Sequence, residues 1–93
     1  MSAEKNILVL ARRDHAEAMR VAAGLTIFGH RLDVVFMTAP VAETAENAAN
    51  AELLEMTGIE PRTTVPAMAD DLPLLDPVAL AAAFASADIV LSL

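Results

Sequence analysis

Several polar residues follow the aliphatic segments of this chain, and their side chains are of types that bind charged ligands. Arginine guanidinium groups bind phosphate or carboxylate through paired hydrogen bonds, and backbone amides at the start of a helix also attract anions. In open parallel sheets, ligands bind beyond the carboxyl ends of the strands. The sequence therefore contains a candidate site for a small anion or a nucleotide at this edge. Its members are Arg12, Arg13, Asp14, His15 and Thr38, with Thr63, Thr64 and Ser92 at the same predicted edge.

A solvated turn is the simpler interpretation of the same residues. Asp14, followed three residues later by Glu17, matches the capping box that starts many helices. The segment has no glycine-rich loop, although close approach of the backbone to a phosphate usually needs one. The sequence therefore favours a capped, solvated turn over a ligand site, and both interpretations stay open.

Catalysis has little support in the sequence. The chain has no cysteine, which excludes disulfides, thiolate metal sites and thiol catalysis. His15 and His30 lack the spacing of a metal site, and structural roles are favoured for both. We therefore expect no catalytic residue, no metal and no cofactor. An enzyme that uses His15 or Asp14 is the least favoured hypothesis.

The charge balance of the chain is strongly acidic. Thirteen Asp and Glu residues against six Lys and Arg give a formal net charge of −7. Nucleic-acid binding needs cationic side chains that displace counterions, so we expect no nucleic-acid partner. We also expect no membrane association, because the negative charge disfavours anionic membrane surfaces and no apolar run is long enough to span a bilayer. Residues 1–6 are polar and do not resemble a signal segment, so a cytoplasmic protein is expected.

Aliphatic runs alternate with helix-forming segments along the whole chain, which predicts an α/β fold. Asp14, Pro40 and the pair Asp76-Pro77 are the predicted helix starts. We expect one domain, 1–93, with three α/β/α layers and a mainly parallel sheet of four or five strands. The predicted strands are 6–11, 32–37, 59–65 (weakened by Pro61) and 89–93, and the predicted helices are 15–28, 41–57 and 78–87.

The apolar content is unusually high for a short chain. Apolar residues make up 56% of the sequence and aromatic residues only 3%. The helix predicted at 15–28 has an apolar stripe wider than half its circumference, and the helix at 78–87 has no charge. Apolar surface of this extent is normally covered by a partner. We therefore expect a homo-oligomer, or assembly with related subunits, through the Ala- and Leu-rich helices.

Two segments of the sequence resemble the DsrE/DsrF-like family, which includes the Tus sulfur-relay subunits. The first runs from Ile7-Leu8-Val9-Leu10 through a helix with the pattern A-x-R-x-A-x-x-L to Gly29-His30 and the strand 33–37. The second is the closing Ala-Asp-x-Val-Leu strand at 87–93. The resemblance implies a DsrE- or flavodoxin-like fold and an oligomeric habit.

The middle of the chain departs from that family. Active members accept a persulfide on a cysteine that follows a central strand, whereas the candidate equivalents here, 38–40 and 65–68, contain none. We therefore expect a cysteine-free, non-catalytic subunit of an oligomer associated with sulfur relay. The alternative is the anion- or nucleotide-binding domain described above.

Overall fold

The computed structural model describes residues 4–93, which form a four-stranded sheet and three α-helices. Residues 1–3, the start of the polar segment noted above, lie outside the described residues. The predicted α/β fold is confirmed, and the sheet has four strands. The elements are β1 (Asn6–Ala11), α1 (His15–Ile27), β2 (Arg31–Phe36), α2 (Ala45–Met56), β3 (Arg62–Thr63), a 3-10 turn (Pro66–Met68), α3 (Pro77–Ser86) and β4 (Ile89–Ser92).

The sheet is entirely parallel, with the strand order β3-β2-β1-β4. The chain adds β2 and β3 on one side of β1 and then crosses to the other side to add β4. Within the register, Asn6 lies beside Arg31 at one end and Ala11 beside Phe36 at the other. The direction of strand addition therefore reverses between β1 and β4, which is the point where open α/β sheets bind ligands.

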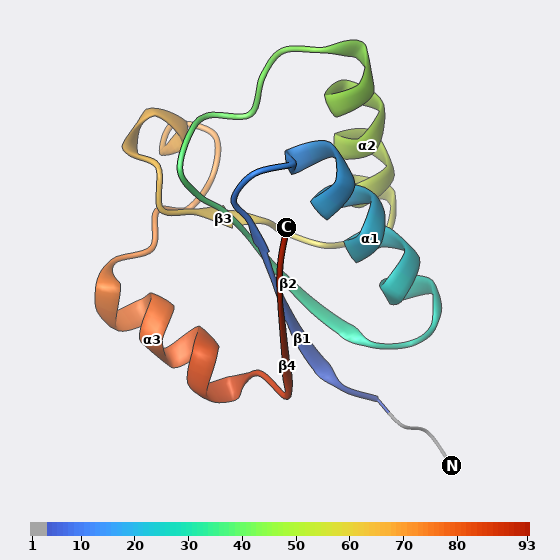
Figure 1. Ribbon diagram of the computed structural model, residues 1–93, viewed down its shortest axis with the longest axis vertical. Coiled ribbons are helices and arrows are strands. Elements are labelled where there is room, and N and C mark those ends of the chain that lie inside the picture. The colour runs from blue at the N-terminus through green and yellow to red at the C-terminus, as the bar shows by residue number, and fades with distance from the viewer. Residues whose placement is uncertain (1–3) are drawn as a thin grey trace.

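The helices form two layers, one on each face of the sheet (Figure 1). Because side chains alternate along a strand, Ile7 and Val9 pack on the side of α1 and α2, where Leu54 completes the core cluster. Leu8 and Leu10 pack on the opposite side, in a smaller cluster with Leu75 and Ala83. Two helices thus cover one face of the sheet, and α3 alone covers the other.

Side-chain caps start the helices, and only one predicted start is wrong. The carboxylates of Asp14 and Asp76 accept hydrogen bonds from the amides of Glu17 and Ala79 at 3.0 and 2.7 Å, as predicted. The start predicted at Pro40 is wrong, because α2 begins at Ala45. Its cap is the hydroxyl of Thr44, which accepts a hydrogen bond from the third helical residue, a bond that a proline side chain cannot make.

Glu17 does not complete the capping box predicted at the start of α1. Its carboxylate pairs instead with the guanidinium group of Arg20, three residues along the exposed face of the helix. The hydrogen bond that Arg20 donates to Glu17, and then the negative charge of Glu17, raise the pKa of Arg20. The pair lies at the solvent surface, where such ion pairs contribute little to stability.

The third strand is much shorter than the predicted range 59–65. Only Arg62 and Thr63 pair with β2, and Pro61, which has no N–H group, precedes them. The segment 73–75 runs along the outer side of this strand. The amide of Thr63 donates to the carbonyl of Pro73 at 3.0 Å, and the amide of Leu75 donates to the carbonyl of Thr63 at 2.8 Å. This edge of the sheet is therefore covered by the chain itself.

Candidate functional site

The turn between β1 and α1 reaches the carboxyl edge of the sheet, as the sequence predicts. The amides of Arg12, Arg13 and Asp14 all point to one acceptor, a backbone oxygen of Leu93, at 3.2, 2.7 and 3.2 Å. Successive amides arranged in this way form a concavity that suits an anion. Here an oxygen of the chain itself accepts all three hydrogen bonds, so Leu93 competes directly with any anion at this position.

Two of the predicted ligand-binding side chains hold neighbouring elements together. The guanidinium of Arg12 donates to the hydroxyl of Ser92 at 3.4 Å, which links the turn to the end of β4. His15 is half-buried, and its ring meets the ring of Phe36 edge-on with centroids 5.6 Å apart. Its Nε2 atom lies 3.3 Å from the carbonyl oxygen of Met37. A carbonyl only accepts, so Nε2 carries the proton, and His15 ties the start of α1 to the end of β2.

Three of the predicted residues share one shallow hollow of about 300 Å³. Arg13, Asp14 and His15 line it from one side, and Thr44 and Glu46 line it from the start of α2. The hollow thus combines one guanidinium group with two carboxylates, which weakens its attraction for an anion. Asn47 lies at the same hollow, and its buried Oδ1 atom accepts no hydrogen bond from residues 4–93.

The remaining predicted residues do not join this hollow. Thr38 is exposed and has a φ angle of 79°, a backbone conformation that is rare for a β-branched residue. Thr63 is buried, and its hydroxyl donates to the carbonyl of Phe36 at 2.9 Å and accepts from the amide of Val65 at 2.9 Å. Thr63 therefore stabilises the end of β3 and is not available to a ligand.

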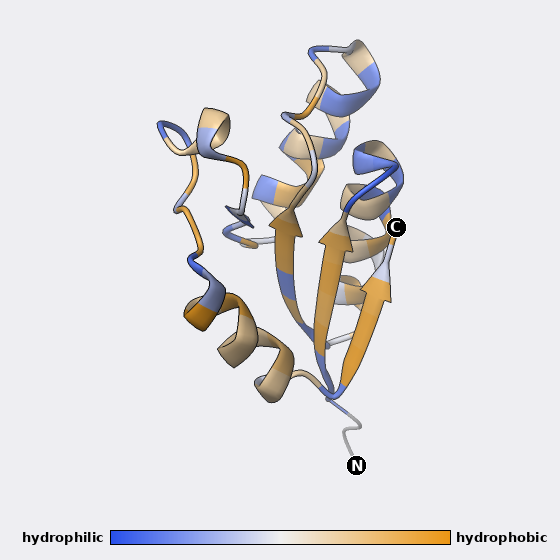
Figure 2. Cartoon of the chain, turned by 60° about the vertical axis from the view of Figure 1, so that its left-hand side comes forward, coloured by the Kyte–Doolittle hydropathy of each residue, from blue (hydrophilic) through white to orange (hydrophobic). Residues whose placement is uncertain are grey.

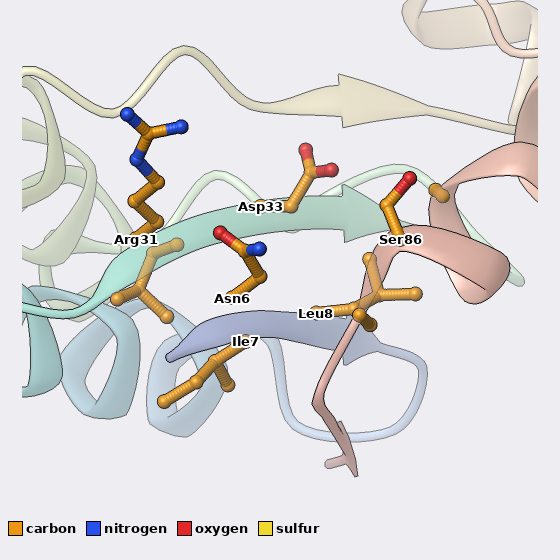
Figure 3. A pocket seen from close by; sticks show the side chains of 9 residues that line it. Asn6, Ile7, Leu8, Arg31, Asp33 and Ser86 are labelled. Carbon is orange, nitrogen blue, oxygen red and sulfur yellow. The ribbon is translucent and has the colours of Figure 1, made fainter. Parts of the chain in front are cut away.

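A second hollow, of about 270 Å³, lies between α3 and the amino ends of β1 and β2 (Figure 3). Two of its polar side chains already have partners. The carboxylate of Asp33 accepts two hydrogen bonds from Arg62 at 2.7 Å, and the hydroxyl of Ser86 donates to the carbonyl of Ala82 at 2.9 Å. We interpret this hollow as incomplete coverage of the sheet by the single helix α3.

The last strand is hydrophobic and lies at the free edge of the sheet (Figure 2). Ile89 and Val90 are each 41% exposed, and β4 has only β1 as a neighbour. On α3, Val78 and Phe84 are also exposed. The segment 77–93 contains a single charged residue, Asp88, whose carboxylate accepts a hydrogen bond from the amide of Asn6 at 2.8 Å. We call the exposed side of Ile89–Ser92 the β4 edge.

Within residues 4–93, no group of three or more histidine, aspartate or glutamate side chains is placed to hold a metal ion. In the same range, no helix is both long enough and apolar enough to cross a membrane.

Comparisons of this chain with family models, with curated proteins and with solved structures find no match. The resemblance to the DsrE/DsrF-like family stays a prediction that rests on the residues quoted above.

Sequence reasoning missed the role of Leu93. Its contact with the turn after β1 depends on β4 lying beside β1, and no local pattern near either segment indicates that pairing.

Proposed function

We propose that this chain is a non-catalytic oligomeric subunit of the DsrE/DsrF-like type, associated with sulfur relay. The segments that carry the resemblance form β1, α1, β2 and β4, whose three strands are adjacent in the sheet. The chain has no cysteine to accept a persulfide, so its contribution to such a complex is structural.

The observation that carries the proposal is the β4 edge. Natural proteins usually protect an edge strand with a charge, a proline, a bulge or a covering segment. The strand Ile89–Ser92 contains neither a charged residue nor a proline, and two of its four side chains are large, apolar and 41% exposed. An edge of this kind readily pairs with another strand.

A second copy of the chain fits this edge better than a charged partner does. Two copies, each with a net charge of −7, repel one another over most of their surfaces. The segment 77–93 is the exception, because Asp88 is its one charged side chain. Two β4 strands related by a two-fold axis would pair antiparallel and extend the sheet across both copies. A related subunit with a similar edge would bind in the same way.

Light scattering on the purified chain tests the proposal. We expect a mass of twice that of the protomer at micromolar concentration. We also expect the mass to persist at high salt, because apolar contacts and backbone hydrogen bonds are not screened as surface charges are. A protomer mass throughout the micromolar range would overturn the proposal.

A second candidate function, binding of a small anion or nucleotide, rests on Arg13 and on the position of the hollow that it lines at the carboxyl edge of the sheet, and the carboxylates of Asp14 and Glu46 oppose it. Thermal-shift measurements with phosphate, sulfate and nucleotides test it, with the double variant Arg12→Ala and Arg13→Ala as the comparison. We expect a ligand-dependent shift that the double variant loses. An unchanged melting temperature with every anion would remove this candidate.

A further inference from the structure

An apolar cavity of about 670 Å³ lies between α2 and the segment that connects β3 to α3. Core side chains form its inner wall, namely Met19 from α1, Phe36 from β2 and Leu54 from α2. Met68 and Leu72, which are half-buried, line it from the connecting segment. Pockets that bind small molecules have volumes of about 300–1,000 Å³, so this cavity has room for a ligand.

The wall of this cavity suits a hydrocarbon better than water. A buried water molecule needs two to four polar partners, and the side chains of the inner wall offer none. Met19 and Met68 have flexible, polarisable thioether side chains, which adapt to ligands of different shape. The Sδ atom of Met68 lies 3.7 Å from the hydroxyl of Thr63, so this side chain packs beside the sheet.

All charged residues that line the cavity are acidic. They are Glu55 on α2, Glu60 in the loop after it and Asp71 in the segment before α3. All three are exposed, which places them at the mouth of the cavity and not in its wall. A ligand with an anionic group would meet three carboxylates there, whereas a cationic group would be attracted by them and by the net charge of the chain.

We propose that this cavity binds a small amphiphilic cation, in which an ammonium group is attached to a hydrocarbon body. The hydrocarbon packs against Met19, Phe36 and Leu54, and the ammonium group lies at the mouth near the carboxylates. The site is next to β3, at the opposite edge of the sheet from β4, so it does not depend on the proposed self-association.

Three ligands with the same chain length test this proposal by calorimetry on the full chain. Octylammonium, octanol and octanoate share one hydrocarbon body, and each is used below the concentration at which it aggregates. We expect octylammonium to bind about tenfold more tightly than octanol, and octanoate to bind most weakly. Equal affinity for all three ligands, or no binding of octylammonium at millimolar concentration, would overturn the proposal.

A pair of tryptophan variants locates the ligand. Ala51 lines the cavity and is exposed on α2, so Ala51→Trp should fill the space and abolish binding of octylammonium. Ala49→Trp places the same side chain on the same helix at an exposed position outside the cavity, and binding should persist. In the unsubstituted chain, octylammonium should shift the amide resonances of Ile59 and Leu72. Shifts confined to Ile89 and Val90 would overturn the assignment.

A matched pair of neutralised variants tests the role of the carboxylates, even if the tryptophan variant fails to fold. The triple variant Glu55→Gln, Glu60→Gln and Asp71→Asn should lose the preference for octylammonium over octanol. The control variant Glu43→Gln, Glu52→Gln and Asp70→Asn removes the same charge from exposed positions that do not line the cavity, and it should retain the preference. If both variants lose the preference, the net charge of the chain explains it, and the proposed binding site is wrong. Light scattering on the same samples reports self-association separately.

Discussion

The two edges of the sheet differ in whether another segment of the chain pairs with them. At the β3 edge, the strand is only two residues long, and the segment 73–75 pairs with its outer side. Thr63 at this edge is 0% exposed. At the β4 edge, no segment within residues 4–93 pairs with the outer side of the strand, and Ile89 and Val90 remain exposed.

We propose that the difference separates a complete side of the molecule from a side that binds a partner. An open sheet edge is a risk of uncontrolled association, and proteins normally protect it. This chain covers one edge with its own backbone and leaves an apolar, charge-free strand at the other. We infer that the β3 side stabilises the fold and lies beside the cavity, and that the β4 side binds a second copy or a related subunit.

The largest effect is expected from Val90→Asp, which puts a carboxylate in the middle of the β4 edge. In a symmetric pairing, two such carboxylates lose contact with water without gaining a partner. We expect the dissociation constant of the dimer to rise at least about a hundredfold, as measured by light scattering or sedimentation over a range of concentrations.

The matched control is Leu74→Asp at the opposite edge. Leu74 is 51% exposed and forms a bridge with Thr63, so the change adds the same charge at a similar exposure. We expect the dissociation constant of this variant to stay close to that of the unsubstituted chain. If both variants dissociate equally, the repulsion comes from net charge, and the contrast between the edges is lost.

The second effect concerns the protected edge and uses Thr63→Val. Valine keeps the shape of threonine but removes the hydroxyl, which leaves the amide of Val65 without its acceptor. An unsatisfied buried donor costs about 1–3 kcal/mol, so we expect the free energy of unfolding to fall by about 2 kcal/mol in urea titrations at one protein concentration.

Thr63→Ser is the control for that substitution. It keeps the hydroxyl and removes one buried methyl group, which costs about 0.8 kcal/mol. We expect this variant to be more stable than Thr63→Val. The reverse order would mean that packing of the methyl group, and not the hydrogen bond, holds β3 in place.

Much of the fold could be predicted because it depends on local patterns. The strand Asn6–Ala11 matches its predicted bounds, since a continuous aliphatic run bounded by polar residues is typical of a strand buried on both faces. The caps at Asp14 and Asp76 could be predicted because a carboxylate directly before a helix accepts a hydrogen bond from an amide of the first turn. The length of β3 was not predictable, because it depends on how far β2 extends and on a segment ten residues further along the chain.

The candidate site was predicted only in part. The sequence placed Arg12, Arg13 and Asp14 at the carboxyl edge, because that position follows from the order of strands and helices. It could not show that Leu93 occupies their amides, or that Arg12 binds a hydroxyl 80 residues away. The apolar cavity was also missed, since its wall combines side chains from segments that no sequence pattern connects.

The smallest effect is expected from the ion pair that joins β3 to β2. One guanidinium nitrogen of Arg62 lies 2.7 Å from both carboxylate oxygens of Asp33, and both side chains remain partly exposed. Ion pairs of this kind contribute about 0.2–1 kcal/mol, and salt weakens them. A double-mutant cycle with Asp33→Asn and Arg62→Met should give a coupling energy in that range, and the coupling should decrease as salt is added.

The cycle also distinguishes two explanations of the protected edge. If the coupling is close to zero, backbone pairing with segment 73–75 and the hydroxyl of Thr63 are sufficient to hold β3. If it exceeds about 2 kcal/mol and resists salt, the pair is shielded from water in solution, as expected for a charged pair in a desolvated environment. In that case a partner covers the α3 side of the sheet at β3 as well. The β4 edge would then not be the only contact between copies, and the contrast between the two edges would have to be abandoned.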